Sequence, residues 1–155
     1  MSAPEVDLLE GEQLMSDGDE LVFRQITVHM MHGDKVATSA FGPATADRGM
    51  PSYSRSSVVT AQGARDWHTE HANSPSLGVW AVSVAETIRA ERYTVDDSQT
   101  ALPEGEKRAP GHCFVDYRGL SKQVEREVRG KLYFAAMARG EVVTIASVGD
   151  GELFT

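Results

Sequence analysis

The sequence predicts an α+β fold, a single small domain with a mostly antiparallel sheet and two main helices packed on it. Three observations support this prediction. Several short stretches alternate apolar and polar residues with the period of a strand. Two longer segments, residues 61–73 and 122–139, have helical periodicity and follow residues that favour helix N-caps. No glycine-rich phosphate loop and no internal repeat occur in the 155 residues.

The negative charge of the chain is concentrated at its start. Seven of the 23 acidic residues lie within residues 1–20, which contain no lysine or arginine, while residues 21–155 carry all 15 basic residues and the other 16 acids. We therefore expect an acidic, flexible N-terminal arm over residues 1–20 and one globular domain over residues 21–155. A nearly neutral domain argues against binding to a nucleic-acid backbone, which needs a concentrated basic face.

The first half of the domain is expected to hold a strand, a long loop and a helix. Residues 21–30 alternate in the strand manner and are rich in β-branched side chains. Residues 32–57 are rich in Gly, Pro, Ser, Asp and Thr, which is typical of loops, and short strands are expected around "VATSAF" and "PSYSRSSVV". Thr60 is a suitable N-cap for a helix over residues 61–73.

The middle of the chain is expected to hold the most regular strand. Residues 77–84 are apolar or small on both faces, which favours a central strand covered on both sides. Ser83 and Glu86 have the spacing of a capping box, so a short helix over residues 85–92 should follow. Residues 93–97 are expected to form a short edge strand.

The last part of the chain predicts two strands around the longest helix. Residues 112–117 alternate and form a strand on which Cys113 faces the core as a small apolar residue. The helix over residues 122–139 has an apolar stripe, an N-cap at Ser121 and a glycine, Gly140, just beyond its end. Residues 141–148 are expected to form a final strand.

The segment "HTEH" raises the question of a metal site. His68 and His71 lie three residues apart, close together on a helix, but the order differs from the H-E-x-x-H zinc signature and further ligands are not evident. We therefore interpret the segment as one side of an ordinary helix, with Trp67 facing the core and His68 exposed, and keep a metal site at His68 and His71 as the alternative. No cofactor is expected.

A second candidate site combines residues from distant segments. Arg24 lies on the first strand, and Ser52 and Ser54 follow in the long loop. An arginine followed by Ser-x-Ser can bind a dinucleotide in NAD-consuming enzymes, because a guanidinium contacts phosphate with two parallel hydrogen bonds. With a histidine, His112 or one of the "HTEH" pair, these residues predict a catalytic pocket only if the fold brings them together.

The functional expectation has two alternatives. The first is a small protein-binding or accessory module, of the kind that regulates or inhibits other proteins in phages and bacteria, whose partner is another protein. The second is an enzyme that acts on a nucleotide or NAD through Arg24, Ser52, Ser54 and His112. The single cysteine cannot form an internal disulfide, and no secretory signal or membrane-spanning run is visible, so a cytoplasmic location is expected.

Overall fold

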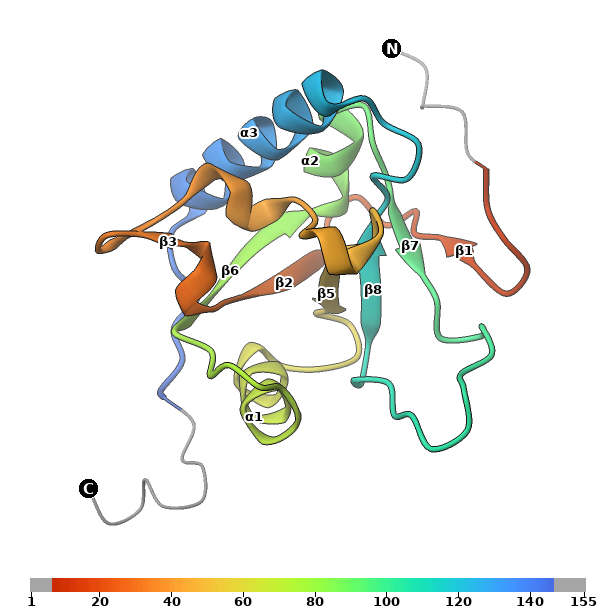
Figure 1. Cartoon of the computed structure of the whole chain (residues 1–155), viewed down its shortest axis with the longest axis horizontal. Helices are drawn as coiled ribbons and strands as arrows, with labels where there is room; N and C mark the ends of the chain where they lie inside the picture. Colours follow the sequence, from red (N-terminus) through yellow and green to blue (C-terminus); the bar gives the residue numbers. More distant parts are fainter. Residues whose placement is uncertain (1–6, 147–155) are drawn as a thin grey trace.

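A computed structural model describes residues 7–146 as a six-stranded antiparallel sheet, a two-stranded hairpin and three α-helices (Figure 1). The predicted α+β fold is therefore confirmed. The strands of the large sheet follow the order β1 (Gln13–Leu14), β7 (Thr94–Asp96), β8 (His112–Val115), β5 (Ser52–Arg55), β2 (Leu21–Ile26) and β6 (Gly78–Ser83). The hairpin is β3 (Met31–His32) and β4 (Lys35–Val36), and the helices are α1 (Ala61–His71), α2 (Val84–Arg89) and α3 (Lys122–Arg139).

The long helices cover opposite faces of the sheet (Figure 1). Val22 of β2 belongs to the larger core, which α3 closes with side chains such as Leu132. The next residue, Phe23, points to the other face and packs beside Ala61 of α1 in a smaller cluster. This alternation follows from the two-residue period of a strand. The α3 side is thus the main core, whereas α1 covers only part of the opposite face.

Local capping signals place the helices as predicted. The side chain of Thr60 accepts a hydrogen bond from Gly63, and that of Ser121 accepts one from Val124. Ser83 and Glu86 form the expected capping box at the start of α2. Gly140 follows α3 with a φ of 89°, a conformation that strongly favours glycine. None of the helices among residues 7–146 is both long and apolar enough to cross a membrane.

Three strands differ from the sequence-based expectation. β6 is covered on both faces, but it lies at the end of the sheet and pairs along its length with β2 alone. β7 is an interior strand, because the short β1 pairs with its outer side. Of the expected final strand, residues 147 and 148 lie outside the described part, and the rest makes one isolated bridge, Val79 to Val142. Pairing order depends on distant segments, which a local pattern does not contain.

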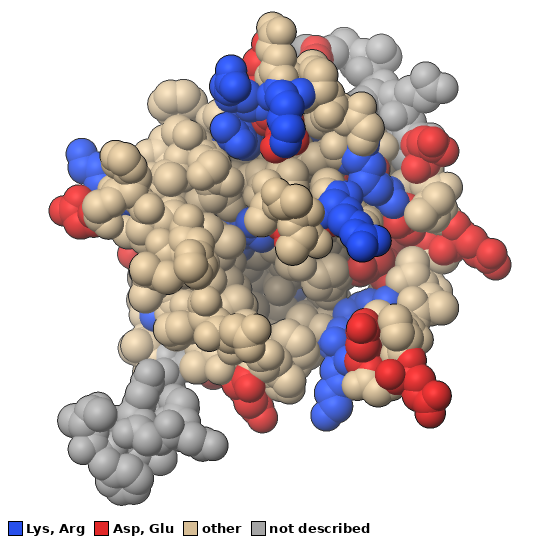
Figure 2. Space-filling view, in the orientation of Figure 1, with Lys and Arg blue, Asp and Glu red and all other residues tan. Residues whose placement is uncertain are grey.

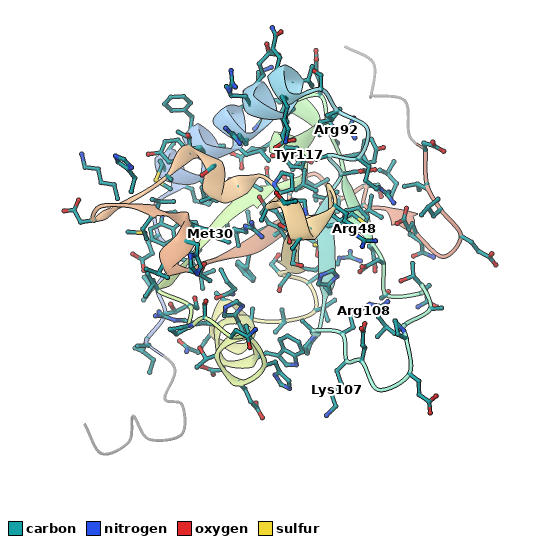
Figure 3. The ribbon with its side chains drawn as sticks, viewed as in Figure 1. Met30, Arg48, Arg92, Lys107, Arg108 and Tyr117 are labelled. Carbon is teal, nitrogen blue, oxygen red and sulfur yellow. The ribbon has the colours of Figure 1, made fainter. Side chains whose placement is uncertain are left out.

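The long loop over residues 32–57 is held in place by side chains. It contains η2 (Thr38–Phe41), a short 3₁₀-helix whose Phe41 is fully buried. The carbonyl oxygen of Phe41 accepts hydrogen bonds from the hydroxyls of Tyr53 and Tyr117 at 2.7 and 3.1 Å (Figure 3 labels Tyr117). Burial raises the pKa of both tyrosine hydroxyls, which therefore stay protonated and donate. Buried donors thus satisfy a carbonyl oxygen of η2, which lies outside the strands of this segment.

The sheet forks between β2 and β5. These strands pair at only two positions, Val22 with Arg55 and Phe23 with Ser54. Beyond Phe23, β2 continues alongside β6, while β5 continues alongside β8. In the gap between the two strands, a side-chain hydrogen bond replaces the backbone hydrogen bonds. Nη1 of Arg24 donates to the carbonyl oxygen of Ser52 at 2.9 Å. The fork gives the α1 face a recess in the sheet.

Residues 7–20, expected as part of a flexible arm, pack on the sheet in the structure. β1 pairs with β7, and Met15 is only 4% exposed within the main core. Glu12 receives two hydrogen bonds from Arg118, at 2.8 and 2.9 Å. Two of the acidic side chains, Glu12 and Glu20, are therefore partners of basic side chains in the body. Residues 1–6 lie outside the described part.

Glu20 should make stability depend on pH. It is buried and accepts hydrogen bonds from Nε and Nη2 of Arg55, which hold the pKa of its carboxyl below the usual value. A depressed folded-state pKa adds stability above the unfolded-state pKa, and this is lost as the pH falls through the folded-state value. At pH 7 we expect Glu20→Gln to lower the free energy of unfolding by about 2 kcal/mol.

Urea denaturation at pH 7 and pH 3 tests this expectation. The difference between the unmodified protein and Glu20→Gln should shrink at pH 3, because protonation of Glu20 removes the same charge as the substitution. Glu10→Gln is the matched control, since Glu10 is exposed and its loss should change stability by less than about 0.5 kcal/mol. A difference that is equal at both pH values would contradict a contribution from the ionised carboxylate.

Candidate functional site

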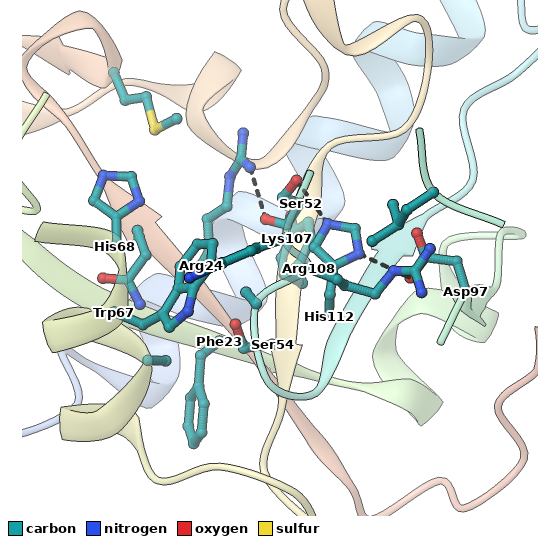
Figure 4. Close-up of a pocket in the computed structure, with 16 residues that line it drawn as sticks. Phe23, Arg24, Ser52, Ser54, Trp67, His68, Asp97, Lys107, Arg108 and His112 are labelled. Carbon is teal, nitrogen blue, oxygen red and sulfur yellow. Dashed lines mark hydrogen bonds and ion pairs between the residues drawn. The ribbon is translucent and has the colours of Figure 1, made fainter. Parts of the chain in front are cut away.

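The recess in the sheet forms a cavity of about 390 Å³. Its walls come from β2, β5 and β8, from α1 and from the loop that precedes β8 (Figure 4). Met30 approaches it from the segment after β2, and Lys107 and Arg108 approach it from the loop before β8 (Figure 3). Figure 2 shows a hollow at the centre of this face, with basic side chains on its right-hand rim. The volume lies within the usual range of small-molecule sites.

Most of the sequence-predicted site residues meet at this cavity. It is lined by Arg24, Ser52, Ser54 and His112, the four residues of the predicted catalytic pocket, and by His68. The register of β5 and β8 explains part of this convergence, because Ser54 lies directly opposite His112. Ser52 and Ser54 alternate with the buried Tyr53 and therefore share one face of the sheet. Their catalytic role stays a prediction.

His112 links a serine and an aspartate. Its Nδ1 lies 2.8 Å from Oδ1 of Asp97, and its Nε2 lies 3.0 Å from Oγ of Ser52 (Figure 4). The carboxylate accepts, so Nδ1 donates the proton, and Nε2 of the neutral ring accepts from the Ser52 hydroxyl. Asp97 follows β7, whose pairing with β8 sets Asp96 opposite Cys113 and so brings Asp97 close to His112.

Arg24 is committed to the backbone rather than open to a ligand. Its Nε donates to the carbonyl of Ala40 at 2.8 Å, Nη1 to that of Ser52 at 2.9 Å and Nη2 to that of Gly42 at 3.2 Å. The side chain is buried and its guanidinium lies over the Tyr53 ring, 5.2 Å from the centroid. The expected two-point contact with phosphate is therefore replaced by a positioning role that joins β2, η2 and β5.

The two helix histidines have separate surroundings. Nε2 of His68 lies 2.8 Å from the carbonyl oxygen of Ser74, and burial lowers the pKa of the His68 ring. His71 is exposed, and its Nδ1 lies 2.8 Å from the carbonyl oxygen of Trp67. Within residues 7–146 no group of three or more His, Cys, Asp or Glu side chains is arranged to hold a metal ion. The histidines thus bind different carbonyls in the structure, and a metal at this pair stays a prediction.

Trp67 and His68 differ from the expected pattern of burial. Trp67 was expected in the core and His68 in solvent, but both are half-buried and both line the cavity. The residues of α1 that are buried are Ala64 and Arg65. The Trp67 indole stacks on the His71 ring with centroids 4.0 Å apart and an interplanar angle of 15°. One face of the indole is therefore covered by His71, which leaves the opposite face and the edge for the cavity.

Cys113 takes no part in the site. It is buried on the core face of β8, as the alternation of the strand predicts, and burial raises the pKa of its thiol well above the usual value. A thiol that stays protonated is a poor nucleophile. The reactive candidates on β5 and β8 are thus the side chains on the opposite face.

Sequence reasoning missed Asp97 and the two basic residues of the following loop. Asp97 was part of a predicted edge strand, and Lys107 and Arg108 belonged to a segment interpreted as a surface loop. Arg108 donates to the carbonyl oxygens of Ser98 and Thr100, so it shapes the loop that carries Asp97. Lys107 is exposed at the cavity. The sequence did contain one signal for Asp97. Asp96 and Asp97 end one expected strand and His112 begins the next, so pairing of these two strands brings an acidic residue close to the histidine.

Comparison with family models, with curated proteins and with solved structures finds no match to this chain.

Proposed function

We propose that this protein is an enzyme that binds a nucleotide or an NAD-type dinucleotide in the cavity between β2, β5, β8 and α1. The observation that carries the proposal is convergence. Arg24, Ser52, Ser54 and His112 come from three strands and line one cavity of ligand size. A polar set of this kind in a concave, partly apolar site is the usual setting of catalysis.

The charge of the cavity supports an anionic ligand. Its lining includes the cations of Arg24, Lys107 and Arg108, and Asp97 supplies the carboxylate. The chain as a whole carries a formal net charge of −8. A locally positive cavity on a negative protein draws anions toward itself, because clefts concentrate the field of the charges that line them. A phosphate group meets this requirement.

The aromatic lining supports a ligand with a flat ring. Trp67 and Phe23 lie at the cavity, and Trp67 is held on one side by the stacked ring of His71. An indole that is already fixed offers its other face to a planar base at a low cost in conformational entropy. Proteins commonly bind nucleotides by stacking an aromatic side chain on the base and placing a cation near the phosphate.

Lys107 replaces Arg24 as the candidate phosphate contact. Three N–H groups of Arg24 bind carbonyl oxygens, and Arg108 binds those of Ser98 and Thr100. Lys107 is exposed at the cavity, where an ammonium can reach a phosphate as a point charge. Arg24 and Arg108 then contribute positive charge and keep the backbone segments around the cavity in place.

The protein-binding module expected from the sequence stays a prediction. It was motivated by a nearly neutral body, an acidic arm and the lack of a recognisable catalytic constellation in the sequence. Glu12 and Glu20 are paired with Arg118 and Arg55 of the same chain. The enzyme proposal therefore takes precedence.

Tryptophan fluorescence tests the proposed ligand class. The chain has two tryptophans, so Trp80→Phe leaves Trp67 as the only one. Stacking of a base on the indole should quench its emission in a saturable way when AMP or NAD is added. Adenosine should bind at least about tenfold more weakly than AMP, because it lacks the phosphate that the cavity charge attracts. Calorimetry on the unmodified protein gives an independent affinity.

Two substitutions make the test specific. Lys107→Gln should weaken AMP binding by about tenfold, as expected for the loss of one charged contact. Lys35→Gln is the matched control, because Lys35 is exposed on β4 and is not part of the cavity lining. The absence of saturable binding of AMP, ADP, ATP and NAD at millimolar concentration would rule out the proposal, as would equal weakening by both substitutions.

A further inference from the structure

The geometry points to Ser52 as a covalent nucleophile, with His112 as its general base and Asp97 as the residue that orients His112. This inference goes beyond the proposed ligand class and does not depend on it. The substrate class that it implies is a carboxylic ester small enough for the cavity of about 390 Å³. The protein would transfer the acyl group of such an ester first to Ser52 and then to water.

The hydrogen-bond directions have the sense that this chemistry needs. Asp97 accepts from Nδ1 of His112 at 2.8 Å, which leaves Nε2 as the acceptor for the Ser52 hydroxyl at 3.0 Å. A nucleophile, a base and an orienting carboxylate within hydrogen-bond reach define an activated serine whatever the fold. The side chains of His112 and Asp97 are 22% and 18% exposed, so the pair is partly shielded from water, while Ser52 is exposed.

Ser52 is held in place by its backbone. Its backbone carbonyl accepts from Nη1 of Arg24 at 2.9 Å, and its strand pairs with β8 on the side of His112. Figure 4 shows Ser52 between Arg24 and His112. Arg24 is therefore a positioning residue, and its charge, with that of Lys107, favours the negative oxygen that forms when a carbonyl is attacked.

The reaction balances without a further reagent. Oγ of Ser52 attacks the ester carbon as its proton passes to Nε2 of His112. The bond to the alcohol oxygen then breaks, the alcohol leaves with that proton, and the acyl group stays on Ser52. Water adds to this acyl ester by the same route, which releases the acid and restores the serine. If the proposed ligand class also holds, the ester is one borne by a nucleotide.

Covalent labelling tests the inference directly. A fluorophosphonate reacts with an activated serine because Oγ displaces fluoride from phosphorus, and mass spectrometry then locates the modified residue. We expect the label on Ser52, and no labelling of this peptide in Ser52→Ala. Ser39→Ala is the control, since Ser39 is exposed on η2 and is not part of the cavity lining, and its labelling rate should stay within twofold of that of the unmodified protein.

The base and the orienting residue have separate readouts. His112→Gln should slow labelling about 100-fold, the lower range for loss of a general base. Asp97→Asn should slow labelling at least about tenfold, because an amide no longer fixes the proton on Nδ1 of His112, and Asp97→Glu, which restores a carboxylate, should recover most of the rate. The charged groups that face His112 include Arg24, Lys107 and Arg108, and each is retained in these variants. Equal labelling rates in Asp97→Asn and Asp97→Glu would show that Asp97 does not orient His112 through its carboxylate.

A second probe covers the case in which the fluorophosphonate does not fit the cavity. p-Nitrophenyl acetate should release a burst of about one p-nitrophenolate per protein molecule as Ser52 is acetylated. A folded protein that neither probe modifies at Ser52 overturns the inference, and so does equal labelling in Ser52→Ala and Ser39→Ala. Labelling of Ser52 without AMP or NAD binding would refute only the ligand class, and AMP or NAD binding by the unmodified protein without any labelling of Ser52 would refute only the nucleophile.

Discussion

Arg24→Leu should lower the free energy of unfolding by about 3–5 kcal/mol, because three backbone carbonyls lose their donor. The carbonyl oxygens of Ala40 and Gly42 face a buried guanidinium, and the leucine that replaces it donates no hydrogen bond. The fork between β2 and β5 should then change shape, since the link to Ser52 is also lost. Urea denaturation measures the first effect, and loss of Ser52 labelling measures the second.

Two further variants identify the cause. Arg24→Lys keeps the charge but should recover less than half of the lost stability, because one ammonium does not match the planar spacing of three carbonyls. Arg89→Leu is the control on the opposite extreme, since the Arg89 side chain is 69% exposed and its loss should cost less than about 0.5 kcal/mol. A cost below about 1 kcal/mol for Arg24→Leu would contradict the positioning role.

Deletion of residues 1–15 should lower the melting temperature by roughly 6–12 °C, which corresponds to a loss of about 3 kcal/mol for a domain of this size. The deletion removes β1, the pairing of Glu12 with Arg118 and the buried side chain of Met15. A flexible arm predicts the opposite result, a melting temperature within a few degrees of that of the full chain. Calorimetry or circular dichroism distinguishes the two outcomes.

Substitutions at the end of β1 and at the residue that follows it test whether this segment packs on the sheet. Met15→Ala should cost about 2 kcal/mol through lost burial and the cavity that remains, because Met15 is 4% exposed. Leu14→Ala is the matched control, since Leu14 is 43% exposed and its removal should cost less than about 1 kcal/mol. Equal costs for the two substitutions would show that the segment does not pack as described.

The candidate site could be assembled only in part from the sequence. Arg24, Ser52, Ser54 and His112 were chosen by chemical type, and the register of β5 and β8 accounts for two of them sharing a face. Arg24 was expected to contact phosphate. The backbone carbonyls that it binds instead belong to distant segments, which the sequence around Arg24 does not reveal. Asp97 was not chosen, because its distance to His112 depends on how β7 pairs with β8.

Local chemistry is what the sequence by itself determined. Thr60, Ser83 and Ser121 begin helices because a cap and the N–H groups it satisfies lie within three residues of each other. Strand alternation likewise put Cys113 on the core face. Each of these outcomes depends on residues that are close together in the sequence, so the sequence alone is enough to predict it.

The tertiary structure alone decided the sheet order, the packing of residues 7–20 and the cavity. β6 is an end strand and β7 an interior one because strands far apart in sequence compete for the same edges. The cavity lies where backbone pairing between β2 and β5 stops and Arg24 reaches across to Ser52. Contacts of this kind join residues tens of positions apart, and their free energy is set by the partners that folding supplies rather than by any local pattern.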